Sequence, residues 1–199
     1  MKYICQIDYD HIPYPTRYAL TDEKEVARGK STTVKTSGCG LCSSIMVAHR
    51  LLPNCQFGLE DALRISYETK ANAYVGTTYP RYAPAFAQFL GLKYEPTDDP
   101  QQLLHCLRTG GAAVAHCGGD HDEYIGTFSH KGHYVAVINE EQDGRIAVLD
   151  PSYKEGKYEE EGRKGKVEMK NGVVALCDLQ VLINDTASRK PCFHLFWRG

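Results

Sequence analysis

Apolar residues in the first half of the chain recur every three or four positions, the spacing of one helix face. The clearest pattern predicts a helix of about three turns between Gly40 and Pro53, with its apolar positions at Leu41, Ile45, Ala48 and Leu52. The same spacing predicts three more helices, at about 58–66, after Pro84 as far as Gly91, and after Pro100 as far as Leu107. Residues 1–38 are predicted to be irregular.

Short apolar and β-branched runs replace this spacing in the second half and predict strands. They cover residues 112–116, 134–138, 145–149, 173–176 and 192–197, with a turn-rich segment at 139–144. Residues 154–172, rich in Lys, Glu and Gly, are expected to form a solvated loop or an exposed hairpin. Helices followed by antiparallel strands indicate an α+β fold. We expect one domain over residues 1–199, with a helical lobe at about 38–110 and a sheet lobe at about 111–199.

The composition is that of an ordinary soluble domain, and it excludes several classes of function. The 199 residues carry 23 Lys and Arg against 25 Asp and Glu, which leaves no electrostatic footprint for nucleic acid. No apolar run reaches the roughly 18 residues of a membrane span, so no membrane partner is expected. Residues 1–10 lack the pattern of a secretory signal, so we expect a cytoplasmic location.

The eight cysteines are an unusual count, and four interpretations compete for them. A disulfide framework is typical of short secreted chains, which this sequence does not resemble. A zinc site usually has two paired clusters, whereas one Cys-x-x-Cys pair, Cys39 and Cys42, is present. That pair would also suit a redox dithiol. The fourth interpretation is one nucleophilic cysteine among buried thiols, because free cysteine is often buried.

Cys39 stands apart from the other cysteines because it lies where the first predicted helix begins. Backbone N–H groups at a helix N-terminus stabilise a thiolate and lower its pKa. The flanking Gly38 and Gly40 would let substrate or backbone approach closely. A small residue in a tight turn would give the same local pattern, so the sequence around Cys39 leaves both interpretations open.

His133 is the best-placed base among the eight histidines because it begins the strand at 134–138, where a side chain can face a cleft. Asp150 ends the next strand. If residues 139–144 form the loop of a hairpin, these two residues pair directly, with Cβ atoms about 4.5–5.5 Å apart. The carboxylate would then orient the imidazole. A tighter turn at Asp143 and Gly144 would shift this register.

A cysteine activated by an oriented histidine is the arrangement used for acyl transfer. Such a site also needs hydrogen-bond donors for the oxyanion of the intermediate. Gln6 is a candidate side-chain donor, together with the backbone N–H of Cys39. A glutamine near an N-terminus is more often part of a polar surface.

Four segments, in this order, resemble those of the bacteriocin-leader-peptidase-like cysteine peptidases. They are Gln6–Asp8, Thr33–Gly40, Gly132–Val135 and Val148–Pro151. The resemblance spans roughly residues 3–155 and implies a papain-like fold. It also implies that Cys39 is the nucleophile, His133 the general base, Asp150 its orienting partner and Gln6 the oxyanion donor. The sequence departs from the family at Leu41 and Cys42, where the family often has Pro followed by Thr or Ser.

We therefore expect a thiol-dependent hydrolase of peptide or related amide bonds, with no cofactor and no bound metal. One alternative is a thioredoxin-like oxidoreductase that uses Cys39 and Cys42, although no apolar strand precedes the pair. A second is a metal site in the loop at 116–122, which holds His, Cys and Asp residues but would equally form a polar border of the cleft. A third is a peptidase-fold binding module without activity. Acyl transfer, the side-chain preference and the oligomeric state stay open.

Overall fold

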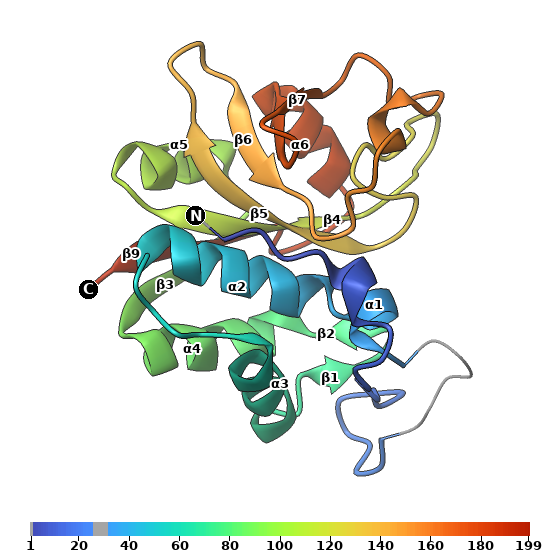
Figure 1. Cartoon of the computed structure of the whole chain (residues 1–199), viewed down its shortest axis with the longest axis vertical. Coiled ribbons are helices and arrows are strands. Elements are labelled where there is room, and N and C mark those ends of the chain that lie inside the picture. Colours follow the sequence, from blue (N-terminus) through green and yellow to red (C-terminus); the bar gives the residue numbers. More distant parts are fainter. Residues whose placement is uncertain (1, 26–31) are drawn as a thin grey trace.

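A computed structural model describes residues 2–25 and 32–199, and its main feature is an antiparallel sheet. The seven strands have the order β3-β9-β4-β5-β6-β8-β7 (Figure 1). They are β3 (Leu92–Thr97), β4 (Ala112–Cys117), β5 (His133–Glu140), β6 (Ile146–Leu149), β7 (Glu168–Lys170), β8 (Val174–Cys177) and β9 (Phe193–Arg198). A separate two-stranded hairpin consists of β1 (Asn72–Ala73) and β2 (Gly76–Thr77).

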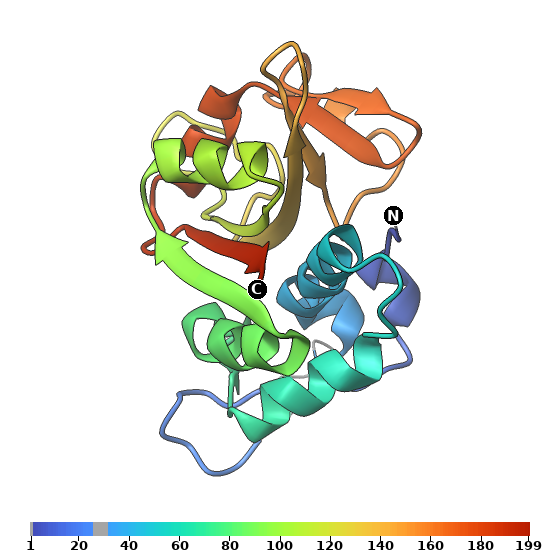
Figure 2. The same ribbon diagram turned by 90° about the vertical axis from the view of Figure 1, so that its left-hand side faces the viewer.

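Helices cover both faces of the large sheet (Figures 1 and 2). One face is covered by α2 (Cys39–Leu51) and α4 (Tyr79–Leu90), and α3 (Leu59–Glu68) packs against these two helices. The other is covered by α5 (Pro100–Arg108) and α6 (Leu179–Thr186). Three short elements complete the fold, namely α1 (Val34–Ser37) and the 3-10 helices η1 (Gln6–Tyr9) and η2 (Lys157–Glu159).

The central strands are apolar throughout because each face of the sheet meets a separate hydrophobic core. Val114 and Ala136 point into the core shared with α2, α3 and α4. Ala115 and Val135 point into the core shared with α5 and α6. Since successive side chains of a strand alternate between faces, burial of both faces requires continuous apolar runs. The helix α2 packs directly on β5 and β4, and this packing brings the first residue of α2 close to the first residue of β5.

This architecture confirms the predicted α+β class with an antiparallel sheet, and most of the predicted elements are present. The helix predicted after Gly40 is α2, and all five predicted strands occur within a few residues of their expected positions. The segment predicted as a loop or exposed hairpin contains η2 and β7, and β7 pairs with β8. None of the helices in the described part of the chain is long and apolar enough to cross a membrane.

Some elements differ from the predictions. The helix expected after Pro84 begins at Tyr79, so its predicted start was wrong. Pro84 lies in the middle of the helix, where it removes one backbone N–H. The strand β3 was not predicted because Leu92 is its one buried residue; its polar side chains are tolerated at the sheet edge. Both β3 and α5 lie in the range predicted as a helical lobe, yet β3 joins the sheet and α5 covers its far face.

Candidate active site

Cys39 is the first residue of α2 and is partly exposed. The short helix α1 ends just before it, and Gly38 joins the two helices. A Cβ atom on Gly38 would lie 2.6 Å from both the side chain and the carbonyl oxygen of Val34, so this connection needs glycine. A Cβ atom on Gly40 would lie 3.1 Å from the Cβ of Thr77. The two glycines therefore allow the start of α2 to pack closely against its neighbours.

His133 is the first residue of β5 and is buried. The strand is held against α2 by a hydrogen bond of 3.1 Å from the Ser43 hydroxyl to the carbonyl oxygen of Tyr134. Nε2 of His133 lies 2.8 Å from Oδ1 of Asp150, which leaves Nδ1 as the ring nitrogen for Cys39. The structure thus brings together the cysteine, histidine and aspartate singled out in the sequence.

The electrostatic environment favours a charged pair at Cys39 and His133. Burial alone would raise the pKa of the Cys39 thiol, but its interaction with His133 and that ring's positive charge hold the pKa below the ordinary value. Burial alone would lower the pKa of His133, but the charge and hydrogen bond of Asp150 raise it to about 9. Around neutral pH these opposite shifts favour a thiolate beside an imidazolium.

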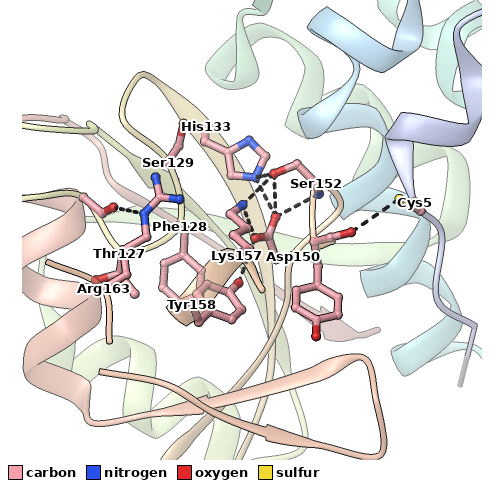
Figure 3. Close-up of polar contacts among 12 residues, drawn as sticks. Cys5, Thr127, Phe128, Ser129, His133, Asp150, Ser152, Lys157, Tyr158 and Arg163 are labelled. Atoms are coloured by element: carbon pink, nitrogen blue, oxygen red, sulfur yellow. Dashed lines mark hydrogen bonds and ion pairs between the residues drawn. The ribbon is translucent and has the colours of Figure 1, made fainter. Parts of the chain in front are cut away.

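Asp150 is fully enclosed and is held by several neighbours (Figure 3). One carboxylate oxygen, Oδ1, accepts hydrogen bonds from the backbone N–H and the hydroxyl of Ser152, at 2.8 and 3.0 Å. The other, Oδ2, lies 2.5 Å from Nζ of Lys157 and 2.8 Å from the hydroxyl of Tyr158. Burial would raise the pKa of Asp150, but the charges of His133 and Lys157 lower it far below its usual range. The carboxylate therefore stays ionised.

The register of the hairpin differs from the predicted one. Ala136 pairs with Leu149, so the continuation of the ladder places Asp150 opposite Val135 and not opposite His133. The turn is tight, with Gly144 at a positive φ of 84°, and a bulge between Val137 and Asn139 changes the register once more. His133 and Asp150 are diagonal neighbours on one face of the sheet, which is still within reach of an imidazole ring.

Two contacts of the Asp150 carboxylate escaped the sequence analysis. Lys157 and Tyr158 lie in the charged segment that was expected to be solvated, yet both are buried. The Nζ atom of Lys157 also donates to the Ser152 hydroxyl at 2.8 Å, and that hydroxyl lies 3.1 Å from Nε2 of His133. A tyrosine next to a lysine in an otherwise charged run was the one local signal of this burial.

Gln6 begins η1 and is buried near the same site. Its backbone N–H donates to the carbonyl oxygen of Pro151 at 2.7 Å, which ties η1 to the end of the β5–β6 hairpin. Its side-chain Nε2 donates to the carbonyl oxygen of Lys35 at 2.6 Å. An amide nitrogen carries two hydrogens, so one N–H of Nε2 is not needed for this bond. Its role toward an oxyanion stays a prediction.

Cys42 lies one helical turn after Cys39 but has a different environment. Its side chain is fully buried, and burial raises the pKa of its thiol strongly. Burial likewise raises the pKa of Cys106 and Cys177 to about 12 and that of Cys192 to about 11. The described cysteines are all free thiols, and among those with a resolved shift Cys39 is the one whose pKa is lowered.

The candidate metal ligands at 116–122 do not lie together in the structure. The His116 ring stacks on Tyr134 at a centroid distance of 4.2 Å, and its pKa is lowered to about 3 by burial and by the charge of Arg189. Asp120 pairs with His130 at 2.9 Å. Within residues 2–25 and 32–199, no group of three His, Cys, Asp or Glu side chains is placed to hold a metal ion.

A pocket of about 320 Å³ opens beside Cys39. Its walls come from the β1–β2 hairpin, from the ends of β4 and β5, and from the segment 189–191 before β9. A nucleophile at the edge of a pocket is the arrangement expected for an enzyme that acts on a bound substrate.

Comparisons with known proteins support the fold. No protein-family model matches the chain, and no curated protein matches it. Among solved structures, it is similar to that of a Bacillus anthracis protein described as a "putative C39-like peptidase". The TM-score is 0.51 at 10% sequence identity, and the match covers 96% of each chain. At this identity the likeness shows a shared fold over almost the whole length of both chains.

Proposed function

We propose that this chain is a thiol-dependent hydrolase of peptide or related amide bonds, with a papain-like arrangement of Cys39, His133 and Asp150. The observation that carries the proposal is the placement of Cys39 at the start of α2, beside a pocket and next to His133, whose Nε2 is 2.8 Å from the buried carboxylate of Asp150. The lowered pKa of Cys39 and the raised pKa of His133 agree with this arrangement. The fold shared with a protein described as a C39-like peptidase supports the same reaction class.

In the proposed first step, Sγ of the Cys39 thiolate attacks the carbonyl carbon of the substrate and forms a C–S bond. The carbonyl π electrons move to the oxygen, and the resulting oxyanion receives hydrogen bonds from the backbone N–H of Cys39 and from Nε2 of Gln6. The C–N bond then breaks, and the imidazolium of His133 gives its proton to the leaving amine. A thioester acyl-enzyme and a neutral imidazole remain.

In the second step, His133 takes a proton from water, and the hydroxide that forms attacks the thioester carbonyl. When this intermediate collapses, the C–S bond breaks and the carboxylic acid leaves. The thiolate and the imidazolium are restored. Asp150 stays ionised throughout and keeps Nδ1 of His133 directed at Cys39 through its bond to Nε2.

The alternative dithiol chemistry has weaker support. It would use Cys42 to attack a mixed disulfide at Cys39, which leaves the buried pair of His133 and Asp150 without a role. The element before Cys39 is also the short helix α1 and not a strand.

The proposal is tested by combining selective alkylation with a peptide-library cleavage profile. Iodoacetamide at low concentration and pH about 6 is expected to label Cys39 first, because the pKa of its thiol is lowered. Burial raises the pKa of the thiols of Cys42, Cys106, Cys117, Cys177 and Cys192. The wild type should cleave members of the library, and Cys39→Ala should lose both labelling and cleavage. Labelling of another cysteine at this pH, or cleavage that survives in Cys39→Ala, would contradict the proposal.

A further inference from the structure

The pocket beside Cys39 carries positive charge on one of its walls. Arg189 and Lys190, which lie between α6 and β9, both line it. The opposite wall includes Tyr74 and Val75, which form the exposed tip of the β1–β2 hairpin. The pocket therefore combines an apolar side with a cationic side.

The guanidinium of Arg189 lies close to the proposed catalytic histidine. A Cβ atom on Gly132, the residue just before His133, would be 3.1 Å from Nη2 of Arg189. This nitrogen donates one long hydrogen bond, of 3.4 Å, to the carbonyl oxygen of Gly118. Nε of Arg189 is buried and has no hydrogen-bond partner among the described residues. The structure thus leaves much of the donor capacity of this side chain unused.

Neither cation of this wall has a counter-ion in the described part of the chain. No Asp or Glu there lies within 4.0 Å of Arg189 or Lys190, although other cations in the same part of the chain are paired, such as Arg108 with Glu140 and Arg145 with Glu168. His116, which faces the same wall, is uncharged at neutral pH because burial and Arg189 lower its pKa. A partly buried guanidinium without a counter-ion favours an anion that can accept two of its N–H groups.

We propose that Arg189 binds a carboxylate of the substrate, so that the enzyme prefers peptides with a carboxylate within about two residues of the scissile bond. This inference rests on the proposed function, since it assigns the substrate class of the same site. Two residues of extended chain span about 7 Å, and Arg189 is expected within this reach because its guanidinium lies beside Gly132, one residue before the proposed general base. The source of the carboxylate is an acidic side chain or the C-terminus of the peptide.

The experiment measures kcat/KM for two sets of peptides with the wild type and with Arg189→Met. In the first set, a peptide blocked at both ends carries Glu, Gln or Lys at each position around a cleaved bond. In the second, one neutral peptide ends in either a free carboxylate or an amide. Hydrogen bonds to a charged group suggest a preference of about 10- to 100-fold for the carboxylate. That preference should vanish in Arg189→Met and be partly restored in Arg189→Lys.

Two controls separate the outcomes. Arg108→Met removes an exposed arginine that pairs with Glu140, at the end of β5 opposite to His133, and it should leave the preference unchanged. Alkylation of Cys39 at the wild-type rate in Arg189→Met shows that this variant is folded and keeps its nucleophile. Equal cleavage of acidic and neutral peptides, or a preference that survives in Arg189→Met, would refute the role of Arg189 and leave the proposed hydrolase intact. Failure to cleave any peptide would refute both.

Discussion

The two oxygens of the Asp150 carboxylate contact different basic side chains. Oδ1 lies 2.8 Å from Nε2 of His133, and Oδ2 lies 2.5 Å from Nζ of Lys157. All three side chains are buried. In this arrangement the positive charge of Lys157 offsets part of the negative charge that His133 experiences. In the proposed mechanism, Lys157 would thus be a positioning residue that also limits the basicity of the imidazole.

Removal of this lysine tests that relationship. In Lys157→Met, His133 should bind its proton more tightly, because a nearby positive charge is lost. The alkaline limb of peptide hydrolysis should then move up by about one pH unit. The free energy of unfolding should fall by about 3 kcal/mol, as expected when a buried ion pair loses one partner. Lys154→Met, an exposed site three residues earlier, is the matched control for both measurements. An alkaline limb that stays in place would show that Lys157 has a structural role alone.

The pH dependence of the wild type follows from the two shifted pKa values. Hydrolysis needs a deprotonated Cys39 and a protonated His133, so its rate should rise as pH passes the lowered pKa of Cys39 and fall as pH passes about 9. Alkylation needs the thiolate alone, so it should show the acidic limb without the alkaline fall. Since the two groups interact, each limb reports the pair. An alkylation rate that rises with a midpoint near 9 would exclude an activated thiol.

Asp150→Asn keeps the shape of the side chain and removes its charge. The pKa of His133 should drop from about 9 toward its ordinary value or below it, because burial then acts without an opposing carboxylate. Hydrolysis near neutral pH should slow by roughly 100- to 10,000-fold. This change also leaves Lys157 buried without its carboxylate, so its stability cost should be reduced in the double variant with Lys157→Met. A single variant with normal hydrolysis would remove Asp150 from the proposed mechanism.

Gln6→Ala tests the oxyanion role. If Nε2 of Gln6 donates to the oxyanion, the substitution should lower kcat by roughly 100- to 1,000-fold and leave the alkylation of Cys39 almost unchanged. Alkylation forms no oxyanion, so the two rates separate transition-state stabilisation from damage to the nucleophile. A fall in both rates together would indicate that Gln6 serves the local structure through its bond to Lys35.

Cys42→Ala separates the hydrolase from a dithiol enzyme. We expect peptide hydrolysis and alkylation of Cys39 to continue at rates close to those of the wild type, because Cys42 is buried and its thiol is protonated. The loss of a buried sulfur should cost about 1 kcal/mol of stability. Abolished activity in a variant with normal folding would favour dithiol chemistry.

Much of the fold was predictable because local patterns coincide with its central elements. The helix that presents Cys39 has apolar residues at helical spacing, and the strand that begins with His133 is a continuous apolar run. Both patterns can be read from the sequence. By contrast, β3 and α6 were missed because the first is a polar edge strand and the second spans eight residues. Short elements of this kind depend on tertiary packing more than on local pattern.

The candidate site shows the same division. Cys39 and His133 were identifiable because each is the first residue of a helix or a strand whose start can be predicted from the sequence. The exact hairpin register was not, since it depends on the tight turn between Glu141 and Arg145 and on a bulge at Val137 and Asn139, and the strand pattern specifies neither of them. Lys157 was hidden in a charged segment, because its burial depends on a carboxylate seven residues earlier in the chain. Nothing in the sequence around Arg189 indicated a functional role. The pocket that it lines forms only when three segments that are separate in the sequence meet.

The packing of α2 on β5 has a consequence for the biogenesis of the enzyme. The nucleophile and its base lie 94 residues apart in sequence, since they are Cys39 and His133. Until β5 has been synthesised and docked, Cys39 lacks the imidazolium that lowers its pKa and is an ordinary, weakly reactive thiol. On a ribosome-bound chain or an unfolded molecule, Cys39 should therefore react no faster than an ordinary thiol, and its higher reactivity should arise together with native structure. The fold itself would thus restrain the proposed hydrolase during its own synthesis.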